Sequence, residues 1–291
     1  MQLSVLGLGL MGRRMARRLA DEFGEIAVWN RDPAKLDGMD LAGLRVFEDT
    51  KEAVEDADVV VTMLTDGSAV ADVLFDRGVA SAMRRGSILI DMSSIAPWEA
   101  LDHCRRLDEQ GISQLDAPVS GGTVGAESGR LAIMVGGEQA VFERVLPVLR
   151  VLGRPTYLGP AGAGQIAKLA NQVIVGLTIG AVSEGIALAR SGGLDLHAFV
   201  EAIQGGLAGS AILEQLAPRM IAGDFSVRGR SSTHLKDIRN TLKYAAERHL
   251  PLELTKRLET AFASVIDRYG DLDHSALILN VQPATEREVR K

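Results

Sequence analysis

Short hydrophobic runs alternate with longer amphipathic stretches over the first 160 residues of the chain. The runs are rich in Val, Ile and Leu and have the length of buried strands: Leu3–Leu6, Ile26–Trp29, Val59–Leu64, Ile88–Met92, Gln114–Ala117, Leu131–Val135 and Thr156–Leu158. The stretches between them have helical spacing of apolar residues: Met11–Glu22, Ser68–Met83, Pro97–Gln110 and Glu138–Val151. Strands that alternate with helices predict an α/β domain with a doubly wound parallel sheet.

The pattern changes near residue 160. A turn, Gly159-Pro160-Ala161-Gly162, leads into long helical patterns with no convincing strand among them: 163–191, 195–204, 210–222, 232–249 and 252–268. We therefore expect two domains, an α/β domain over residues 1–160 and an all-α domain over residues 161–291.

Composition excludes several classes of protein. Of the 291 residues 46% are hydrophobic and 24% are charged, with a net charge of −6, so nothing favours a nucleic-acid partner. Cys104 is the only cysteine, and the five His show no metal-ligand spacing, so we expect neither a disulfide nor a metal. The apolar stretch 173–189 contains Glu184, which predicts a buried helix and not a membrane span. We expect a cytoplasmic protein.

A glycine-rich turn follows the first predicted strand. Gly7, Gly9 and Gly12 form a G-x-G-x-x-G pattern, Gly7-Leu8-Gly9-Leu10-Met11-Gly12, directly before a predicted helix. In this context the glycines allow a tight turn, the approach of a pyrophosphate to the backbone, and close packing of the helix on the strand. The sequence predicts a Rossmann-like dinucleotide site that includes Leu8, Leu10 and Met11.

The end of the second predicted strand indicates which dinucleotide is bound. A carboxylate there would bond the 2′-hydroxyl of the NAD ribose, but this chain has Asn30 followed by Arg31. A guanidinium can pair with the 2′-phosphate of NADP. Asp32 could take the ribose instead, although Asp32-Pro33 suits the start of a helix. We expect NADP(H) to be preferred, with NAD(H) possible.

Ser120-Gly121-Gly122 follows another strand-like segment. Successive glycines expose backbone N–H groups, and the serine hydroxyl adds a further donor, so this loop could hold a carboxylate. A plain turn at the end of a strand explains the local sequence equally well.

Lys168 lies on an otherwise apolar part of the long predicted helix. Asn171 and Gln172 share its face at helical spacing. A desolvated ammonium loses its proton more readily, which suits acid/base chemistry. Taken alone, Lys168 is better explained as a surface lysine that extends to solvent.

Taken together, these motifs resemble the β-hydroxyacid dehydrogenase (3-hydroxyisobutyrate dehydrogenase) family. The matching segments are Gly7–Gly12, the Asp-Ala-Pro-Val-Ser-Gly-Gly run at 116–122, the Gly-x-x-x-Lys-x-x-Asn element from Gly164 to Asn171, and Lys236-Asp237. The resemblance implies that Lys168 is the catalytic acid and base and that Asn171 orients the substrate. It also implies that Ser120, Gly121 and Gly122 bind the substrate carboxylate.

The same resemblance implies further contacts. Ser94 would lie between nicotinamide and substrate, Met63 and Leu64 would line the cofactor cleft, and Lys236 would close over the cofactor. Within the family the chain is most similar to tartronate semialdehyde (2-hydroxy-3-oxopropionate) reductases. It departs from the family at Thr65, where Pro is usual, and at Gly229, where an aromatic residue is usual, so a different substrate pocket is expected there.

The expected reaction is the reversible reduction of a small semialdehyde, with Lys168 supplying the proton. A 3-hydroxyisobutyrate-type or four-carbon sugar-acid dehydrogenase is an alternative. An imine reductase or a non-catalytic NADP-binding module would not need Lys168. The small residues of the helix 163–191 allow close helix packing, so we expect a homodimer or homotetramer through the helical domain.

Overall fold

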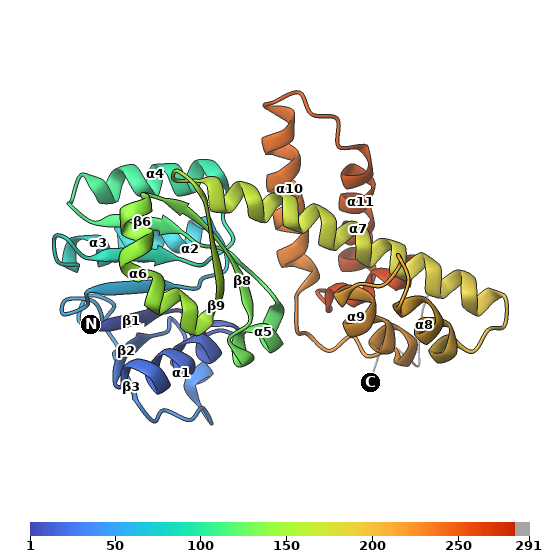
Figure 1. Ribbon diagram of the computed structural model, residues 1–291, viewed down its shortest axis with the longest axis horizontal. Helices are drawn as coiled ribbons and strands as arrows, with labels where there is room; N and C mark the ends of the chain where they lie inside the picture. Colours follow the sequence, from blue (N-terminus) through green and yellow to red (C-terminus); the bar gives the residue numbers. More distant parts are fainter. Residues whose placement is uncertain (283–291) are drawn as a thin grey trace. The chain divides into compact units, whose positions relative to one another are not determined.

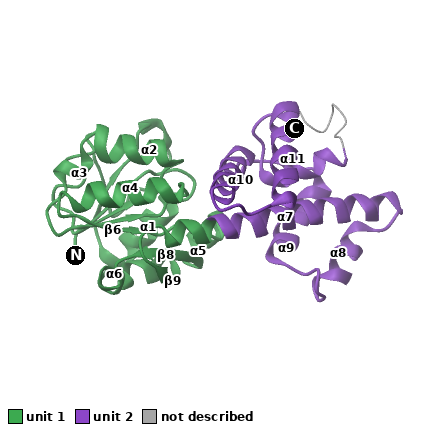
Figure 2. Ribbon diagram, turned by 90° about the horizontal axis from the view of Figure 1, so that it is seen from above, with its two compact units in different colours: residues 1–168 green, residues 169–291 purple. Residues whose placement is uncertain are grey.

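The structure is a computed structural model that describes residues 1–282. The chain forms two compact units, Met1–Lys168 and Leu169–Lys291 (Figure 1, Figure 2). Each unit has its own hydrophobic core, and each is considered by itself below.

Unit 1 is built on one nine-stranded sheet with the order β3-β2-β1-β4-β5-β6-β8-β7, in which β9 also pairs with β8. The strands are β1 (Leu3–Leu6), β2 (Ile26–Trp29), β3 (Leu44–Val46), β4 (Val59–Thr62), β5 (Ile88–Asp91), β6 (Ser113–Asp116), β7 (Val119–Ser120), β8 (Leu131–Gly137) and β9 (Gly153–Gly159). Neighbouring strands from β3 to β6 pair in parallel, which confirms the predicted fold class.

The sheet departs from the expected pattern at β8. This strand runs antiparallel to both β6 and β7, and parallel to β9. The sequence pattern missed β3 and β7 as strands. Both are short, and β3 has a single buried residue, Leu44, so neither carries a clear hydrophobic run.

Helices cover both faces of the sheet (Figure 2). One face packs on α1 (Gly12–Phe23) and α6 (Gln139–Leu152), and the other on α2 (Gly67–Ala71), α3 (Val79–Ala82) and α4 (Pro97–Asp108). A short helix, α5 (Gly122–Ser128), follows β7. Successive residues of one strand face opposite layers, as Val5 and Leu6 do on β1. A sheet buried on both faces explains why its strands read as continuous hydrophobic runs.

The prediction of one helix over Ser68–Met83 is wrong. The segment consists of α2, a π-helical turn over Asp72–Asp76 and then α3. Gly78 has a φ of +75° and separates the last two pieces, because a residue in the left-handed region cannot continue a right-handed helix.

Among its described residues unit 2 contains helices and the loops between them, and its one extended pairing is an isolated bridge between Arg230 and Asp273. Its helices are the greater part of α7 (Ala163–Ser191), then α8 (Leu196–Gln204), α9 (Ala211–Ala222), α10 (Ser231–Ala246), α11 (Glu253–Tyr269) and a 3-10 helix over His274–Asn280. Phe262 lies fully buried at the centre of the core. The predicted helical domain is confirmed.

Helix α7 is the one described helix long and apolar enough to cross a membrane, with a mean hydropathy of 1.6 over an 18-residue window. Core helices of globular proteins meet the same criterion. Its first turn packs among buried residues of unit 1, where Gln165 is 0% exposed.

Candidate active site

The glycine turn joins β1 to α1 and is shaped for a close approach. Gly7 has a φ of +101°, and a Cβ there would lie 2.5 Å from the carbonyl oxygen of Met63. A Cβ at Gly12 would collide with the carbonyl oxygen of Gly7. A Cβ at Gly9 would meet nothing within 4 Å, so the turn is open on that side. The first and third glycines are thus required by packing, and the second leaves room for a ligand beside the backbone.

Asn30 connects this turn to the end of β2. Its side-chain oxygen accepts a hydrogen bond from the Leu8 N–H at 2.9 Å, and its amide nitrogen donates to the Asp32 carbonyl at 2.7 Å. Arg31 is exposed and has no partner within residues 1–282. Asp32 accepts from the Ala34 N–H and caps a 3-10 turn that begins at Pro33, as predicted for the Asp32-Pro33 pair.

Three further predicted residues follow β4 and β5. Met63 donates its N–H to the carbonyl of Leu6 at 2.9 Å, and Leu64 donates to the Ser93 hydroxyl at 2.9 Å. Ser94 is the next residue of that loop. Strands β1, β4 and β5 are parallel neighbours, so their carboxyl ends meet at one edge of the sheet. This edge carries the glycine turn, Met63, Leu64 and Ser94.

The Ser120-Gly121-Gly122 loop connects β7 to α5. Gly121 has a φ of +133° and Gly122 a φ of +60°. Side-chain-bearing residues rarely adopt either conformation, so the glycines determine how the backbone N–H groups of this loop are presented. Ser120 is half-buried at the end of β7.

Lys168 lies on α7 and is 8% exposed. Its Nζ donates a hydrogen bond to the carbonyl oxygen of Val119 at 2.9 Å, directly beside Ser120. The side chain therefore does not extend to solvent as a surface lysine would. The structure brings Lys168 and the Ser-Gly-Gly loop together.

The sequence pattern did not single out Asp116 as a site residue. This residue ends β6, is 2% exposed and accepts N–H groups of Gly162 and Gln165, each at 2.8 Å. Burial raises the pKa of Asp116 to about 6, the two N–H bonds oppose this, and the nearby Asp91 carboxylate adds to the rise. The only signal in the sequence was a single Asp at the end of a hydrophobic run, and this pattern is too common to identify a site residue.

Asn171 and Lys236 belong to unit 2, where they share a polar cluster. Asn171 donates to the side-chain oxygen of Gln172 at 3.0 Å, and Gln172 donates to the Asp237 carboxylate at 2.8 Å. Lys236 lies 3.1 Å from the other oxygen of that carboxylate. Asp237 is 1% exposed, so one buried carboxylate connects the predicted substrate residue to the predicted cofactor residue.

Gly229, the departure from the family pattern, contacts His274. A Cβ at Gly229 would lie 3.0 Å from the imidazole Cε1 of His274. The backbone N–H of Gly229 donates to the Asp273 carboxylate at 2.8 Å. The imidazole thus occupies space next to the position where the family usually has an aromatic side chain.

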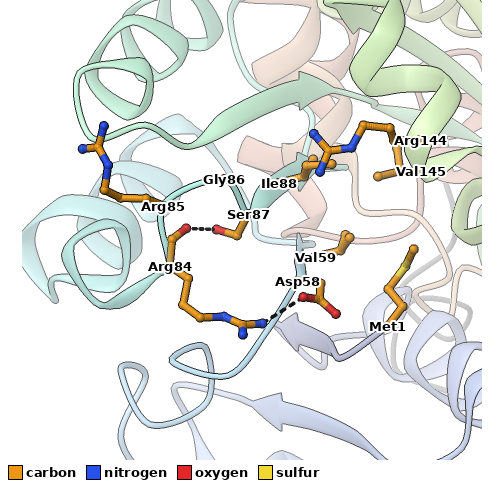
Figure 3. A pocket seen from close by; sticks show the side chains of 10 residues that line it. All are labelled: Met1, Asp58, Val59, Arg84, Arg85, Gly86, Ser87, Ile88, Arg144 and Val145. Atoms are coloured by element: carbon orange, nitrogen blue, oxygen red, sulfur yellow. Dashed lines mark hydrogen bonds and ion pairs between the residues drawn. The ribbon is translucent and has the colours of Figure 1, made fainter.

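A cavity of about 380 Å³ opens elsewhere in unit 1 (Figure 3). Asp58 and Ser87, which directly precede β4 and β5, are among its lining residues, so it lies at the amino ends of these strands. Figure 3 shows Arg84 reaching Asp58, an ion pair of 2.9 Å. The glycine turn and Lys168 are at the opposite ends of the strands, so this cavity is not the candidate active site.

Over residues 1–282 no group of three or more His, Cys, Asp or Glu side chains is placed to hold a metal ion. The candidate site consists of a dinucleotide turn, a donor-rich loop and a buried lysine. These are the parts that a hydride-transfer enzyme needs: a place for the cofactor, an anchor for the substrate and a proton donor.

Comparison with known proteins agrees with this set of parts. Residues 2–167 match the family model of the NAD binding domain of 6-phosphogluconate dehydrogenase, and residues 162–281 match the NAD-binding model of NADP-dependent 3-hydroxyisobutyrate dehydrogenase. The chain is an NAD(P)-binding oxidoreductase with a Rossmann-like unit.

The family follows from full-length relatives. The 2-hydroxy-3-oxopropionate reductase of Escherichia coli K12 is 40% identical over 281 residues, which cover 96% of this chain and 96% of that enzyme. The probable 3-hydroxyisobutyrate dehydrogenase-like 1 protein of Arabidopsis thaliana is 32% identical over 95% of this chain and 84% of its own. The chain belongs to the 3-hydroxyisobutyrate dehydrogenase family.

Solved structures show the same relationship. The 3-hydroxyisobutyrate dehydrogenase of Mycobacterium tuberculosis with L-serine matches with a TM-score of 0.85 and 30% identity, over 97% of this chain and 99% of that one. Psf3 in complex with NADP⁺ and 2-OPP matches with a TM-score of 0.87 and 26% identity, over 96% and 99%. An imine reductase of Streptomyces aurantiacus, at 24% identity and a TM-score of 0.65, shares the fold alone.

Proposed function

We propose that this protein is an NADP(H)-dependent reductase of tartronate semialdehyde, and that it forms glycerate reversibly. The observation that carries the proposal is the Lys168 ammonium, 8% exposed and 2.9 Å from the Val119 carbonyl beside the Ser-Gly-Gly loop. The 40% identity to a 2-hydroxy-3-oxopropionate reductase supports the choice of substrate.

The glycine turn fits a dinucleotide because Gly9 is open where a Cβ would stand, while Gly7 and Gly12 are closed. The pyrophosphate would lie against the amino end of α1. Arg31 is exposed next to the turn and would pair with a 2′-phosphate. When bound, the nicotinamide supplies the hydride that adds to the aldehyde carbon.

The chain's own residues hold the substrate and move the proton. Ser120, Gly121 and Gly122 donate hydrogen bonds to the substrate carboxylate. Lys168 donates its proton to the aldehyde oxygen as the carbon accepts hydride, so the aldehyde becomes an alcohol and Lys168 becomes neutral. In the reverse direction Lys168 accepts the alcohol proton. Asn171, one helical turn further along α7, stabilises the charge that develops on that oxygen.

A substrate series tests the proposal. We expect tartronate semialdehyde to have a higher kcat/KM than its methyl ester by about 10-fold or more, because the ester leaves buried donors without a charged acceptor. The Lys168→Met variant, assayed in parallel, separates enzymatic from background cofactor oxidation.

Three results would change the proposal. Equal kcat/KM for acid and ester would show that the loop does not bind a carboxylate. A four-carbon sugar acid that exceeds tartronate semialdehyde would assign the altered pocket at Gly229 and His274 to a longer substrate. If the protein reduced an imine and none of the acid substrates, it would be assigned an imine reductase activity instead.

A further inference from the structure

The start of helix α7 is attached to the carboxyl end of β6. The Asp116 carboxylate accepts the Gly162 N–H on Oδ1 and the Gln165 N–H on Oδ2, each at 2.8 Å. The Gln165 amide lies in the first turn of α7 and the Gly162 amide directly precedes it, and N–H groups at a helix start have no partner within the helix. A carboxylate at this end also interacts favourably with the helix dipole. Asp116 thus fixes both the position and the direction of the helix start.

Two glycines make this attachment possible. On β8, a Cβ at Gly136 would lie 2.6 Å from Oδ1 of Asp116 and 2.8 Å from the amide nitrogen of Ala163. On α7, a Cβ at Gly164 would lie 2.9 Å from Oδ2 of Asp116. A side chain at either position would push the helix away from the carboxylate.

Gln165 makes a second attachment, to the loop after β5. Its Nε2 donates to the Ser93 carbonyl at 2.9 Å, and its Oε1 accepts from the Ile95 N–H at 3.2 Å. The side chain is 0% exposed. The two bonds enclose Ser94 in sequence, so Gln165 fixes the helix relative to the loop that carries this predicted substrate residue.

Lys168 follows Gln165 by one helical turn. Its Nζ reaches the Val119 carbonyl at 2.9 Å, and that reach depends on where the first turn of α7 lies. We propose that Asp116 and Gln165 are positioning residues that hold Lys168 in register with Ser94 and the Ser120-Gly121-Gly122 loop. This inference rests on the proposed role of Lys168 as the proton donor.

The physical reason is the short range of proton transfer. A general acid must come within about 2.6–3.2 Å of the oxygen that it protonates. A displacement of about 1 Å can cost about 100-fold in rate. A helix start attached by four hydrogen bonds to β6 and to the loop after β5 restricts such displacement.

The test uses Gln165→Met, which keeps the length of the side chain and removes both of its hydrogen bonds. We expect kcat to fall by about 10-fold or more while the Kd of NADPH, measured by fluorescence, changes by less than about 2-fold. Asp116→Asn retains only one oxygen to accept the two N–H groups. It should likewise lower kcat while leaving the Kd of NADPH nearly unchanged.

Gln114→Met is the matched control. Gln114 is 6% exposed on β6, and within residues 1–282 its side-chain amide has no hydrogen-bond partner. Its replacement should leave kcat within about 2-fold of the wild type. Urea unfolding of each variant identifies any that does not fold. If one positioning variant does not fold, the kcat of the other tests the inference.

A double variant distinguishes positioning from general stability. In a Lys168→Met background, Gln165→Met should lower kcat by less than about 2-fold, because a residue that acts through Lys168 has nothing left to position. Full additivity of the two losses would overturn the inference. So would wild-type kcat in both Gln165→Met and Asp116→Asn.

A failure of the proposed function can be distinguished from a failure of the positioning inference. If Lys168→Met keeps the wild-type kcat, Lys168 is not the proton donor, whatever the Gln165 variants do. If Lys168→Met is slow and the positioning variants are not, the function stands and only the positioning is wrong.

Discussion

At the scale of single residues, Lys168 is the proposed proton donor of the reaction. Replacing it with Met keeps the aliphatic stem and removes the ammonium. We expect kcat/KM for the semialdehyde to fall by about 10²–10⁴-fold, the usual contribution of a general acid. Steady-state kinetics measures this, and Lys256→Met on α11, which removes an exposed ammonium, is the control.

Arg31 is the residue on which the choice of cofactor is predicted to depend. Arg31→Ala removes the cation that would pair with the 2′-phosphate, so the ratio of kcat/KM for NADPH to that for NADH should fall by about 10-fold or more. Lys35→Ala, which removes an exposed cation from the adjoining 3-10 turn, should leave the ratio unchanged. An unchanged ratio in Arg31→Ala would place the preference in other residues.

Asp116 gives the protein a specific dependence of stability on pH. Its pKa is raised by burial from 3.8 to about 6, so the unfolded chain releases this proton at a lower pH than the folded chain. Raising the pH from below the unfolded pKa of 3.8 through the folded pKa of about 6 therefore favours unfolding. Relative to Asp116→Asn, the wild type should lose about 2 kcal/mol of stability between about pH 4.5 and about pH 7.5. Urea titrations of both proteins at the two pH values measure the difference, and a constant difference would contradict the assignment.

At the scale of elements, the Asp237 carboxylate connects α10 to α7 through Gln172. Asp237→Ala removes the acceptor of the Gln172 amide and of the Lys236 ammonium in a buried place. We expect a loss of about 1–3 kcal/mol in the free energy of unfolding, because the buried Gln172 amide loses this acceptor. Chemical denaturation measures this, with Asp267→Ala, an exposed position on α11, as the control. Equal effects would show that the cluster does not stabilise unit 2.

At the scale of the whole molecule, α7 has an exposed apolar stripe. Ala170, Ile174, Ala181 and Leu188 are exposed along it, with Ile174 67% and Leu188 75% exposed, and the exposed Glu184 interrupts it between the last two. Their separations of four and seven residues place them on one side of the helix, the spacing of helices that pack on each other. We propose that a second copy of this chain covers the stripe.

Light scattering tests the oligomer. The wild type should have at least twice the mass of the 31.1 kDa chain at micromolar concentration. The combined Ile174→Glu and Leu188→Glu variant should be monomeric, because charges would then be buried in the interface. Leu250→Glu, which changes an exposed apolar residue outside α7, should not alter the mass. A monomeric wild type would contradict the proposal.

The sequence alone determined the class of fold. Continuous hydrophobic runs such as Leu3–Leu6 and Val59–Thr62 are strands because a sheet buried on both faces needs apolar residues at every position. The glycine turn could be read locally, since its constraints act between residues close in sequence. The strand β3 could not, because a short strand is decided by its neighbours in the sheet and not by its own pattern.

Only the tertiary structure decided the surroundings of Lys168. Its spacing with Asn171 is visible in the sequence, but the local sequence alone favours a surface lysine. The structure instead places its Nζ 2.9 Å from the carbonyl oxygen of Val119, 49 positions away. Asp116 and Gln165 meet from separate elements, and neither belongs to a local pattern that specifies a role. Periodicity reports which face of an element is buried, whereas the partner of a buried polar group depends on which elements the fold brings together.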